Sequence, residues 1–193
     1  MAKLYFRYSA MNAGKSTALL QVAHNYESLG RKVLIFTSKI DHRFKPGFIT
    51  SRLGLERESQ AFDEHINFHD LLLASEGIDC VLIDEAQFLT ERHVGQLHRA
   101  AHTLDIPVIC YGIRSDFLGN AFPGSGKLMT LADSLEELKT ICPCGRKATM
   151  NVRVDANGRR ITTGAQVAIE GETRYVELCG KCFYDGSPQG ADT

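Results

Sequence analysis

The chain has 193 residues, of which 44% are hydrophobic and 23% charged, as expected for a soluble globular protein with one substantial core and a small appendage. Lys and Arg (22) nearly balance Asp and Glu (23), so no overall field attracts nucleic acid or an anionic membrane. We find no signal segment and no apolar run near the roughly 20 residues of a membrane-spanning helix. These features predict a cytoplasmic protein with no nucleic-acid or membrane partner.

Residues 3–17 describe a buried strand that ends abruptly and leads into a helix through a small-residue loop ending in Gly14-Lys15-Ser16. This is the layout of a phosphate-binding loop, in which backbone N–H groups and a helix N-terminus hold an oxyanion. Lys15 is expected to reach the terminal phosphates and Ser16 to bind Mg²⁺. Ser9 replaces the first glycine of the usual motif, which extended backbone at a strand end would tolerate. The alternative is a strand–helix turn that merely contains Gly-Lys-Ser.

The segments that follow alternate between strand and helix patterns. Residues 16–29 place their apolar side chains on one helical face, and 32–37 form an apolar strand. A strand, helix and strand with this spacing predict a right-handed crossover in a parallel sheet. The polar, glycine-containing residues 41–58 are expected to form a loop, and 61–75 a second helix.

The middle of the chain predicts two more strands and a capped helix. Thr90 can cap a helix that runs from Glu91 to about residue 104. Strands are expected at 107–112 and at 135–141, the last of the main sheet, with a loop over 113–127. That loop contains Gly-Ser-Gly-Lys, which we interpret as a turn rather than a second phosphate site because no apolar strand precedes it.

Two carboxylates follow the apolar strand pattern that begins at Cys80. Asp84 and Glu85 come directly after Val-Leu-Ile, so they are expected at the C-terminal tip of a central strand. Parallel nucleotide-binding sheets bind ligands at these strand ends, where an acid holds magnesium. Asp84 fits the metal side, and Glu85 fits a general base for an attacking hydroxyl. Two exposed acids at the start of a helix would be the simpler explanation.

Four of the six cysteines form two close pairs near the C-terminal end. Two thiolate pairs on two turns can close a tetrahedral zinc site, and four protein ligands leave no open position, so such a zinc is structural. Disulfides or free thiols are the alternatives. The expected ligands are Cys142, Cys144, Cys179 and Cys182; the other two cysteines lie in apolar strand patterns and are interpreted as core thiols.

The seven histidines are scattered along the chain. His24, His98 and His102 are expected on helix faces and His42 in a loop. None forms a pair with metal-ligand spacing near another candidate ligand, so we assign no role to any of them.

These elements, in this order, resemble those of the type II thymidine kinases over nearly the whole chain. The resemblance implies an α/β fold of the P-loop NTPase (RecA-like) class, with a parallel sheet flanked by helices and a small C-terminal zinc-ribbon-like β domain with a lasso loop. Residues 1–141 would form the ATP-binding domain, and 142–193 the zinc-binding and nucleoside-lid domain with a short disordered tail. Further residues carry the likeness: Met11, Asp41-His-Arg43, Asp84-Glu85-Ala-Gln-Phe88, Asp116-Phe117 and Gly171 to Cys182 with Tyr175.

The resemblance implies ATP-dependent phosphorylation of the 5′-hydroxyl of thymidine, and of deoxyuridine, in pyrimidine deoxynucleotide salvage. It implies a homotetramer inhibited by thymidine triphosphate, with Mg²⁺ and structural Zn²⁺ as cofactors. Lys15, Arg43 and Glu85 would be catalytic, and Ser16 and Asp84 would serve magnesium. The implied ATP-binding residues are Ser9, Ala10, Met11, Asn12, Ala13, Gly14, Lys15, Ser16, Thr17, Asp84, Glu85, Ala86 and Gln87. The implied nucleoside-binding residues are Met11, Phe88, Phe117, Gln166, Ala168, Ile169, Glu170, Gly171 and Tyr175, with Glu170 replacing one glycine of a usual Gly-Gly pair.

Two other functions fit parts of the sequence. Asp-Glu-Ala-Gln also occurs at helicase strand ends, but a helicase needs a second motor core, and this chain has no room for one. A zinc-ribbon module that binds nucleic acid and uses nucleotide as a switch is the other alternative. It rests on a locally basic C-terminal third: Arg146, Lys147, Arg153, Arg159 and Arg160.

Overall fold

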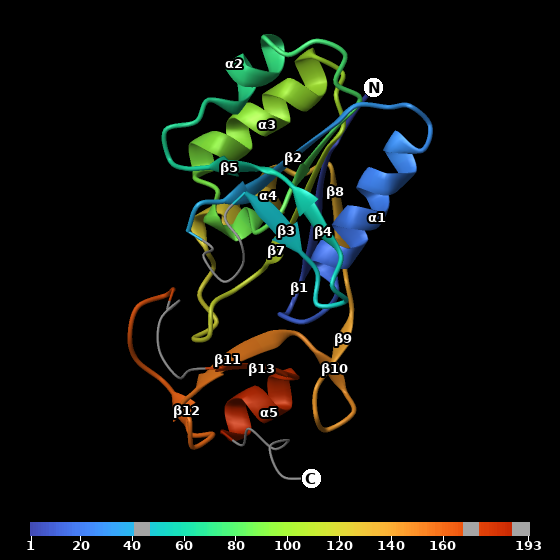
Figure 1. The fold of residues 1–193 in the computed structure, drawn as a ribbon. Helices are drawn as coiled ribbons and strands as arrows, with labels where there is room; N and C mark the ends of the chain where they lie inside the picture. Colours follow the sequence, from blue (N-terminus) through green and yellow to red (C-terminus); the bar gives the residue numbers. More distant parts are fainter. Residues whose placement is uncertain (41–46, 168–173, 187–193) are drawn as a thin grey trace.

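A six-stranded, entirely parallel sheet forms the centre of the protein (Figure 1). The computed structural model describes residues 1–40, 47–167 and 174–186. The strands lie in the order β5-β2-β6-β7-β1-β8. Their bounds are Leu4–Ser9 (β1), Val33–Ser38 (β2), Gln60–Phe62 (β5), Cys80–Ile83 (β6), Val108–Ile113 (β7) and Ser134–Glu137 (β8).

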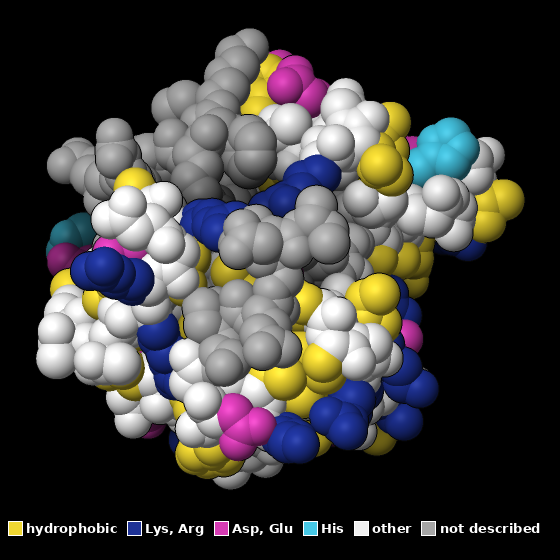
Figure 2. Space-filling view, turned by 90° about the horizontal axis from the view of Figure 1, so that it is seen from below, with side chains coloured by type: hydrophobic (Ala, Val, Ile, Leu, Met, Phe, Trp, Pro, Cys, Tyr) yellow, Lys and Arg dark blue, Asp and Glu magenta, His cyan; other side chains and the backbone are white. Residues whose placement is uncertain are grey.

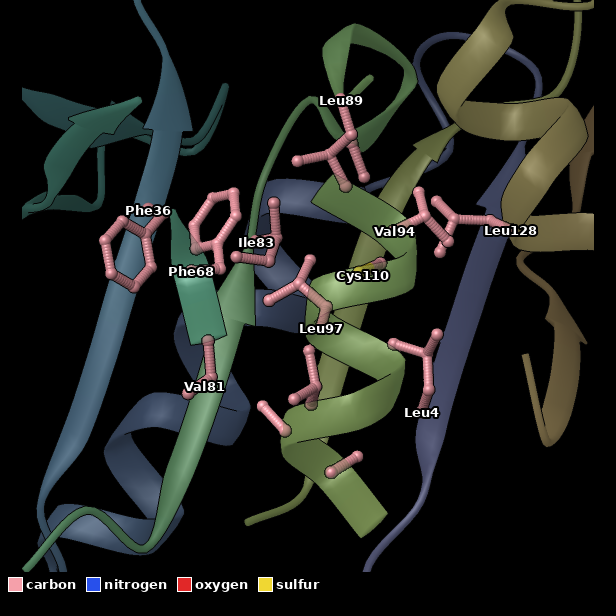
Figure 3. Close-up of a cluster of buried hydrophobic side chains, with 14 of the residues drawn as sticks. Leu4, Phe36, Phe68, Val81, Ile83, Leu89, Val94, Leu97, Cys110 and Leu128 are labelled. Carbon is pink, nitrogen blue, oxygen red and sulfur yellow. The ribbon is translucent and has the colours of Figure 1, made fainter. Parts of the chain in front are cut away.

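Helices cover both faces of the sheet, because side chains along each strand alternate between two apolar cores. In β6, Val81 and Ile83 face one core, whereas Cys80 and Leu82 face the other. Figure 3 shows the first core, where Leu97 lies between α3 and the sheet. The helices of that face are α2 (Phe68–Leu73), α3 (Glu91–Thr103) and α4 (Pro123–Leu131), and α1 (Lys15–Glu27) covers the opposite face.

The C-terminal part has its own sheet and its own core, drawn below the main sheet in Figure 1. Its central strand, β11, pairs antiparallel with β12 and β13. A second small antiparallel pair, β9 with β10, leads into it. The bounds are Thr140–Ile141 (β9), Lys147–Ala148 (β10), Met150–Val154 (β11), Arg160–Ile161 (β12), Arg174–Leu178 (β13) and Gly180–Asp185 (α5).

Most of the expected elements are confirmed. The phosphate loop lies between β1 and α1, and Asp84 directly follows the fully buried strand β6. Thr90 caps α3 by accepting a hydrogen bond from the backbone N–H of His93 (3.2 Å). The expected strand over 135–141 divides into β8, which pairs with β1, and β9, which pairs with β10. Among the described helices, none has the length and apolar character needed to span a membrane.

The predictions for residues 41–75 are partly wrong. The expected loop contains an antiparallel hairpin of β3 (Phe48–Thr50) and β4 (Glu56–Glu58). The expected helix over 61–75 instead starts with strand β5 at the edge of the main sheet, where it gains hydrogen bonds to β2. Helix α2 begins only after Asn67, whose side chain accepts a hydrogen bond from the Asp70 N–H and caps it. Sheet pairing has overridden local helix preference here.

The prediction of a loop and turn over 113–127 is also wrong at its end. Residues 123–127 form the first turns of α4, which starts with proline at a position where no amide donor is needed. Gly124 allows α4 to contact the backbone of residues 86–89, because an added Cβ would lie 2.5 Å from the Leu89 carbonyl oxygen and 2.8 Å from that of Ala86. Gly124 therefore serves close packing rather than a flexible turn.

We predict that Gly124→Ala destabilises the protein by about 1–3 kcal/mol, because the new methyl group overpacks a rigid backbone contact. Gly126→Ala, two residues along the same helix, is the matched control: its Cβ would meet only Ala121 Cβ at 3.8 Å. That substitution is expected to stabilise by up to about 1 kcal/mol, since alanine favours helix. Urea unfolding of both variants measures the difference, and equal stabilities would contradict the packing argument.

Candidate active site and four-cysteine centre

The loop between β1 and α1 contains two residues with left-handed backbone. Gly14 (φ 75°) precedes the first turn of α1, and Asn12 has φ 59°. Ser9 ends β1 in extended conformation, as its replacement of glycine requires. This geometry confirms a tight strand-to-helix loop at the N-terminus of α1, where backbone N–H groups and the helix dipole favour an anion.

Lys15 lies folded across this loop. Its ammonium group donates to Ser9 Oγ (3.1 Å) and to the Ala10 carbonyl oxygen (3.2 Å), and the residue is only 9% exposed. Ser9, which stands where the usual motif has glycine, therefore helps to position Lys15, because its hydroxyl accepts a hydrogen bond from the lysine. A phosphate in the loop would meet a cation already held in position.

The tip of β6 touches the start of α1. Ser16 Oγ donates to Asp84 Oδ2 at 3.0 Å, and Asp84 is 4% exposed. Burial, together with the neighbouring charge of Glu85, raises the pKa of Asp84 to about 7. A buried carboxylate beside a hydroxyl is costly in its charged form unless a cation compensates it, so the two groups fit a hard cation such as Mg²⁺.

Glu85 adopts a left-handed backbone conformation (φ 51°, ψ 41°), which costs a residue with a side chain about 1–2 kcal/mol. Gln87 holds its carboxylate: Gln87 Nε2 donates to Glu85 Oε2, while Gln87 Oε1 accepts from the Ile113 N–H at 3.3 Å. The short 3₁₀ helix Ala86–Phe88 (η1) positions both side chains. The strained turn thus fixes Glu85 where it lines the central cavity.

A cavity of about 880 Å³ brings the predicted groups together. The phosphate loop, η1, the segment after β7 and strands β11 and β13 all contribute to its wall. The predicted residues that line it are Met11, Asn12, Ala13, Gly14, Lys15, Ser16, Thr17, Glu85, Gln87, Phe88, Phe117, Gln166 and Tyr175.

Other predicted residues lie elsewhere. Four of them are buried beneath the cavity wall instead of lining it: Ser9, Ala10, Asp84 and Ala86. Arg43 and the segment from Ala168 to Gly171, with Ile169 and Glu170, lie outside the described residues. The predictions for these positions therefore stay predictions.

Polar contacts tie the segment before residue 168 to the cavity wall. Gln166 Nε2 donates to Asp116 Oδ2 (3.0 Å). Arg153 stacks on the Phe117 ring with its guanidinium carbon 3.9 Å from the ring centre. The same guanidinium donates to the carbonyl oxygens of Ala165 (3.2 Å) and Thr163 (3.3 Å). Arg153 therefore faces this segment and the cavity wall, and it is 4% exposed, unlike a basic residue on a nucleic-acid surface.

The predicted cysteine ligands come together. The sulfur atoms of Cys142, Cys144, Cys179 and Cys182 all lie within 4.8 Å of one another. A hydrogen bond from the Arg146 backbone N–H lowers the pKa of Cys144 to about 6, and the backbone N–H of Cys182 lowers the pKa of Cys179. Backbone amides thus favour the thiolate form that zinc needs at Cys144 and Cys179, whereas hydrogen bonds with Cys144 and Cys179 raise the pKa of Cys182 to about 12. The donor set fits a tetrahedral structural zinc, and none of these four cysteines forms a disulfide in the structure.

Sequence reasoning missed Asn151. This side chain, 2% exposed on β11, accepts a hydrogen bond from the Met11 N–H at 2.8 Å and donates to the Ser115 carbonyl oxygen at 3.4 Å. It joins the C-terminal sheet directly to the phosphate loop. No sequence motif marks it, because the contact spans 140 residues.

We predict that Asn151→Ala weakens ATP binding about fivefold, because the loop loses a hydrogen bond worth about 1 kcal/mol. Asn157→Ala, which removes an exposed amide from the turn after β11, is the matched control and should leave binding unchanged. Calorimetric titration with ATP measures the affinity of each variant, and elemental analysis measures its zinc content. A loss of zinc in Asn151→Ala would show collapse of the C-terminal part instead, and unchanged ATP affinity would contradict the coupling.

Known proteins similar to this chain match it over nearly its whole length. The family described as Thymidine kinase matches residues 2–183. A thymidine kinase of Chromobacterium violaceum is 58% identical over 95% of this chain and 99% of its own length. Relatives with the same name from Idiomarina loihiensis (56% identical; 94% of this chain, 95% of theirs) and Salmonella typhimurium (48%; 100% and 96%) agree. The loop, the acidic strand tip and the four-cysteine cluster therefore occur in a chain that belongs to the thymidine kinase family.

Proposed function

We propose that this protein transfers the terminal phosphoryl group of ATP to the 5′-hydroxyl of thymidine in pyrimidine deoxynucleotide salvage. The observation that carries the proposal is that the phosphate loop and Glu85 line one cavity, with Ser16 held on the buried Asp84 beside it. Phosphoryl transfer requires mainly positioning and charge stabilisation, and these groups supply both.

The phosphate side of the cavity would bind ATP. Residues 10–17 would wrap the triphosphate, with the amides of the loop and Lys15 as donors. Ser16 and Asp84 would hold Mg²⁺, which supplies neutralisation of phosphate charge when bound. Arg43 would assist the transferring phosphate, a role that rests on the family resemblance. The present contact of Lys15 with Ser9 would exchange for one with phosphate oxygen.

Glu85 is the proposed general base. It lines the cavity, and Gln87 holds its carboxylate by a hydrogen bond. A base in this position accepts the proton of the 5′-hydroxyl as that oxygen attacks phosphorus. The strained backbone of Glu85 supports the same role, since strain of this kind is retained where a side chain must point in one direction.

The remaining wall would bind the nucleoside. Met11, Phe88, Phe117 and Tyr175 line the cavity and offer flat or apolar surface to a base and a sugar. Gln166 and the segment up to Gly171 would close over the base as a lasso loop, fixed at its start by Arg153. Closure of such a loop would exclude water, which otherwise competes as an acceptor.

Residues 1–141 would form the ATP-binding domain, and 142–193 the zinc-binding and nucleoside-lid domain. The separate core of the C-terminal sheet supports this division. Zinc on the four cysteines would be structural and would stabilise a unit too small to fold on its own core. The proposal includes four further properties that follow from the family resemblance. They are deoxyuridine as a second substrate, inhibition by thymidine triphosphate, a homotetramer and a cytoplasmic location.

The assignment is tested by incubating the protein with ATP, Mg²⁺ and a panel of nucleosides. ADP should form from ATP when thymidine or deoxyuridine is present. In the same assay, Glu85→Gln should turn over about 10²- to 10⁴-fold more slowly than the wild type while still binding ATP. Glu91→Gln, an exposed acid in the first turn of α3, is the control and should keep full activity. Near-normal turnover of Glu85→Gln would remove Glu85 as the base, and no thymidine-dependent ADP would refute the function.

Removal of one cysteine ligand tests the structural metal. Cys179→Ser should lose most of the bound zinc and unfold the C-terminal sheet, because three ligands hold zinc weakly and the metal supplies folding energy. Cys110→Ala, in the main sheet, should keep the metal even if it lowers stability. Elemental analysis measures zinc per chain, and a Cys179→Ser protein with unchanged zinc would contradict the cluster as its ligand set.

A further inference from the structure

A second cluster of possible metal ligands lies on α3, away from the cavity. Among the described residues, two groups of three or more such side chains gather within 4.8 Å: the four cysteines, and His98, His102 and Asp133. The expectation that no histidine pairs near another candidate ligand is therefore wrong for His98 and His102. Their spacing of four residues on a helix, which places both on one face, is the signal that predicts the pair.

The three side chains converge from two elements. Both imidazoles project from the C-terminal half of α3, with their ring centres 4.6 Å apart. Asp133 comes from the segment between α4 and β8, and its carboxylate oxygens lie 3.1 and 3.2 Å from His102 Nε2. The Asp133 carboxylate is also held by the main chain of β1, because its Oδ2 accepts a hydrogen bond from the Leu4 N–H at 2.8 Å. Figure 3 shows Leu4 beside this end of α3.

These separations suit a shared ion. Nitrogen and oxygen ligands at about 2.0–2.1 Å from zinc stand about 3.4 Å apart at a tetrahedral angle and about 2.9 Å apart at a right angle. The His102 to Asp133 distances fall between these values. The side chains of His102 and Asp133 are 31% and 23% exposed, so an ion can reach them from solvent.

The chemistry of the set is that of zinc-class sites. Two imidazoles with one carboxylate bind Zn²⁺, Ni²⁺, Co²⁺ or Cu²⁺ and leave a position for water. Helical histidines four residues apart are also the spacing used by metal-binding helices in which a third ligand comes from elsewhere. The Leu4 amide orients the carboxylate, as outer partners do at metal sites.

We propose that His98, His102 and Asp133 bind one divalent ion of the zinc class, with water completing its coordination. The ion ties the end of α3 to the start of β8 and, through the Leu4 contact, to β1. The site lies at the edge of the sheet where these strands begin, opposite the edge that carries the phosphate loop. Its role is to stabilise the fold, and the protein then holds two ions of this class in two different ligand sets.

Nickel is the test ion because elemental analysis measures nickel and zinc separately. Nickel bound at the histidine site can therefore be told apart from zinc retained at the cysteine site. Protein without a histidine tag and with its zinc retained is titrated with Ni²⁺ by equilibrium dialysis and elemental analysis. The wild type should bind one nickel per chain. Since loss of an outer partner alone costs 10- to 100-fold in metal affinity, His98→Ala should weaken nickel binding by at least about tenfold.

His98→Ala is the decisive variant, because it keeps the contact between His102 and Asp133 that an ion pair alone would need. His24→Ala and His65→Ala, which remove exposed histidines elsewhere, are matched controls and should bind nickel like the wild type. Nickel should also raise the melting temperature of the wild type and of both controls, but not of His98→Ala. Equal nickel affinity in His98→Ala, or no nickel bound by the wild type, would overturn the proposal.

Discussion

The hydrogen bond between Ser16 Oγ and Asp84 Oδ2 joins the first turn of α1, which follows β1, to the residue after β6, and these two strands are not neighbours in the sheet. β1 leads into the phosphate loop and β6 ends at Asp84, with β7 between them. The contact forms because all strands of a parallel sheet end at the same edge, and because α1 begins directly above that edge. The loop and Glu85 depend on this shared edge for their common cavity, and Asp84 lies buried beside it.

The C-terminal part completes the cavity rather than standing beside it. Asn151 fixes the backbone of the phosphate loop, and Arg153 fixes the segment that leads to the proposed lid. Tyr175 on the neighbouring strand β13 lines the same space. The strands β11 and β13 therefore reach both the phosphate loop and the wall proposed to bind the nucleoside. Zinc on the four cysteines, as proposed, would therefore act on the cavity through the position of these strands and not through the reacting groups.

The fold was predictable where local pattern and tertiary contacts agree. The strands β2, β6 and β7 begin with runs of apolar residues, and β1 leads directly into the Gly-Lys-Ser loop, so the sheet and the acidic tip could be predicted. The hairpin of β3 and β4 could not, because each strand has only three residues, β4 is Glu-Arg-Glu, and the two strands gain their order by pairing with each other. The start of helix α4 was not predicted because of its two glycines, of which Gly124 serves a backbone contact. Asn151 and Asp133 act across more than a hundred residues, and no local signal marks such contacts.

The phosphate loop, Glu85 and the nucleoside wall are proposed to act on one substrate pair in one cavity, with Asp84 holding Ser16 beside it. A crystal structure with a non-hydrolysable ATP analogue, Mg²⁺ and thymidine tests it most directly. We expect Mg²⁺ beside Ser16 and the thymidine 5′-oxygen about 2.6–3.2 Å from a Glu85 carboxylate oxygen, facing the terminal phosphate. A 5′-oxygen pointing away from Glu85, or a nucleotide bound outside the loop between β1 and α1, would contradict it.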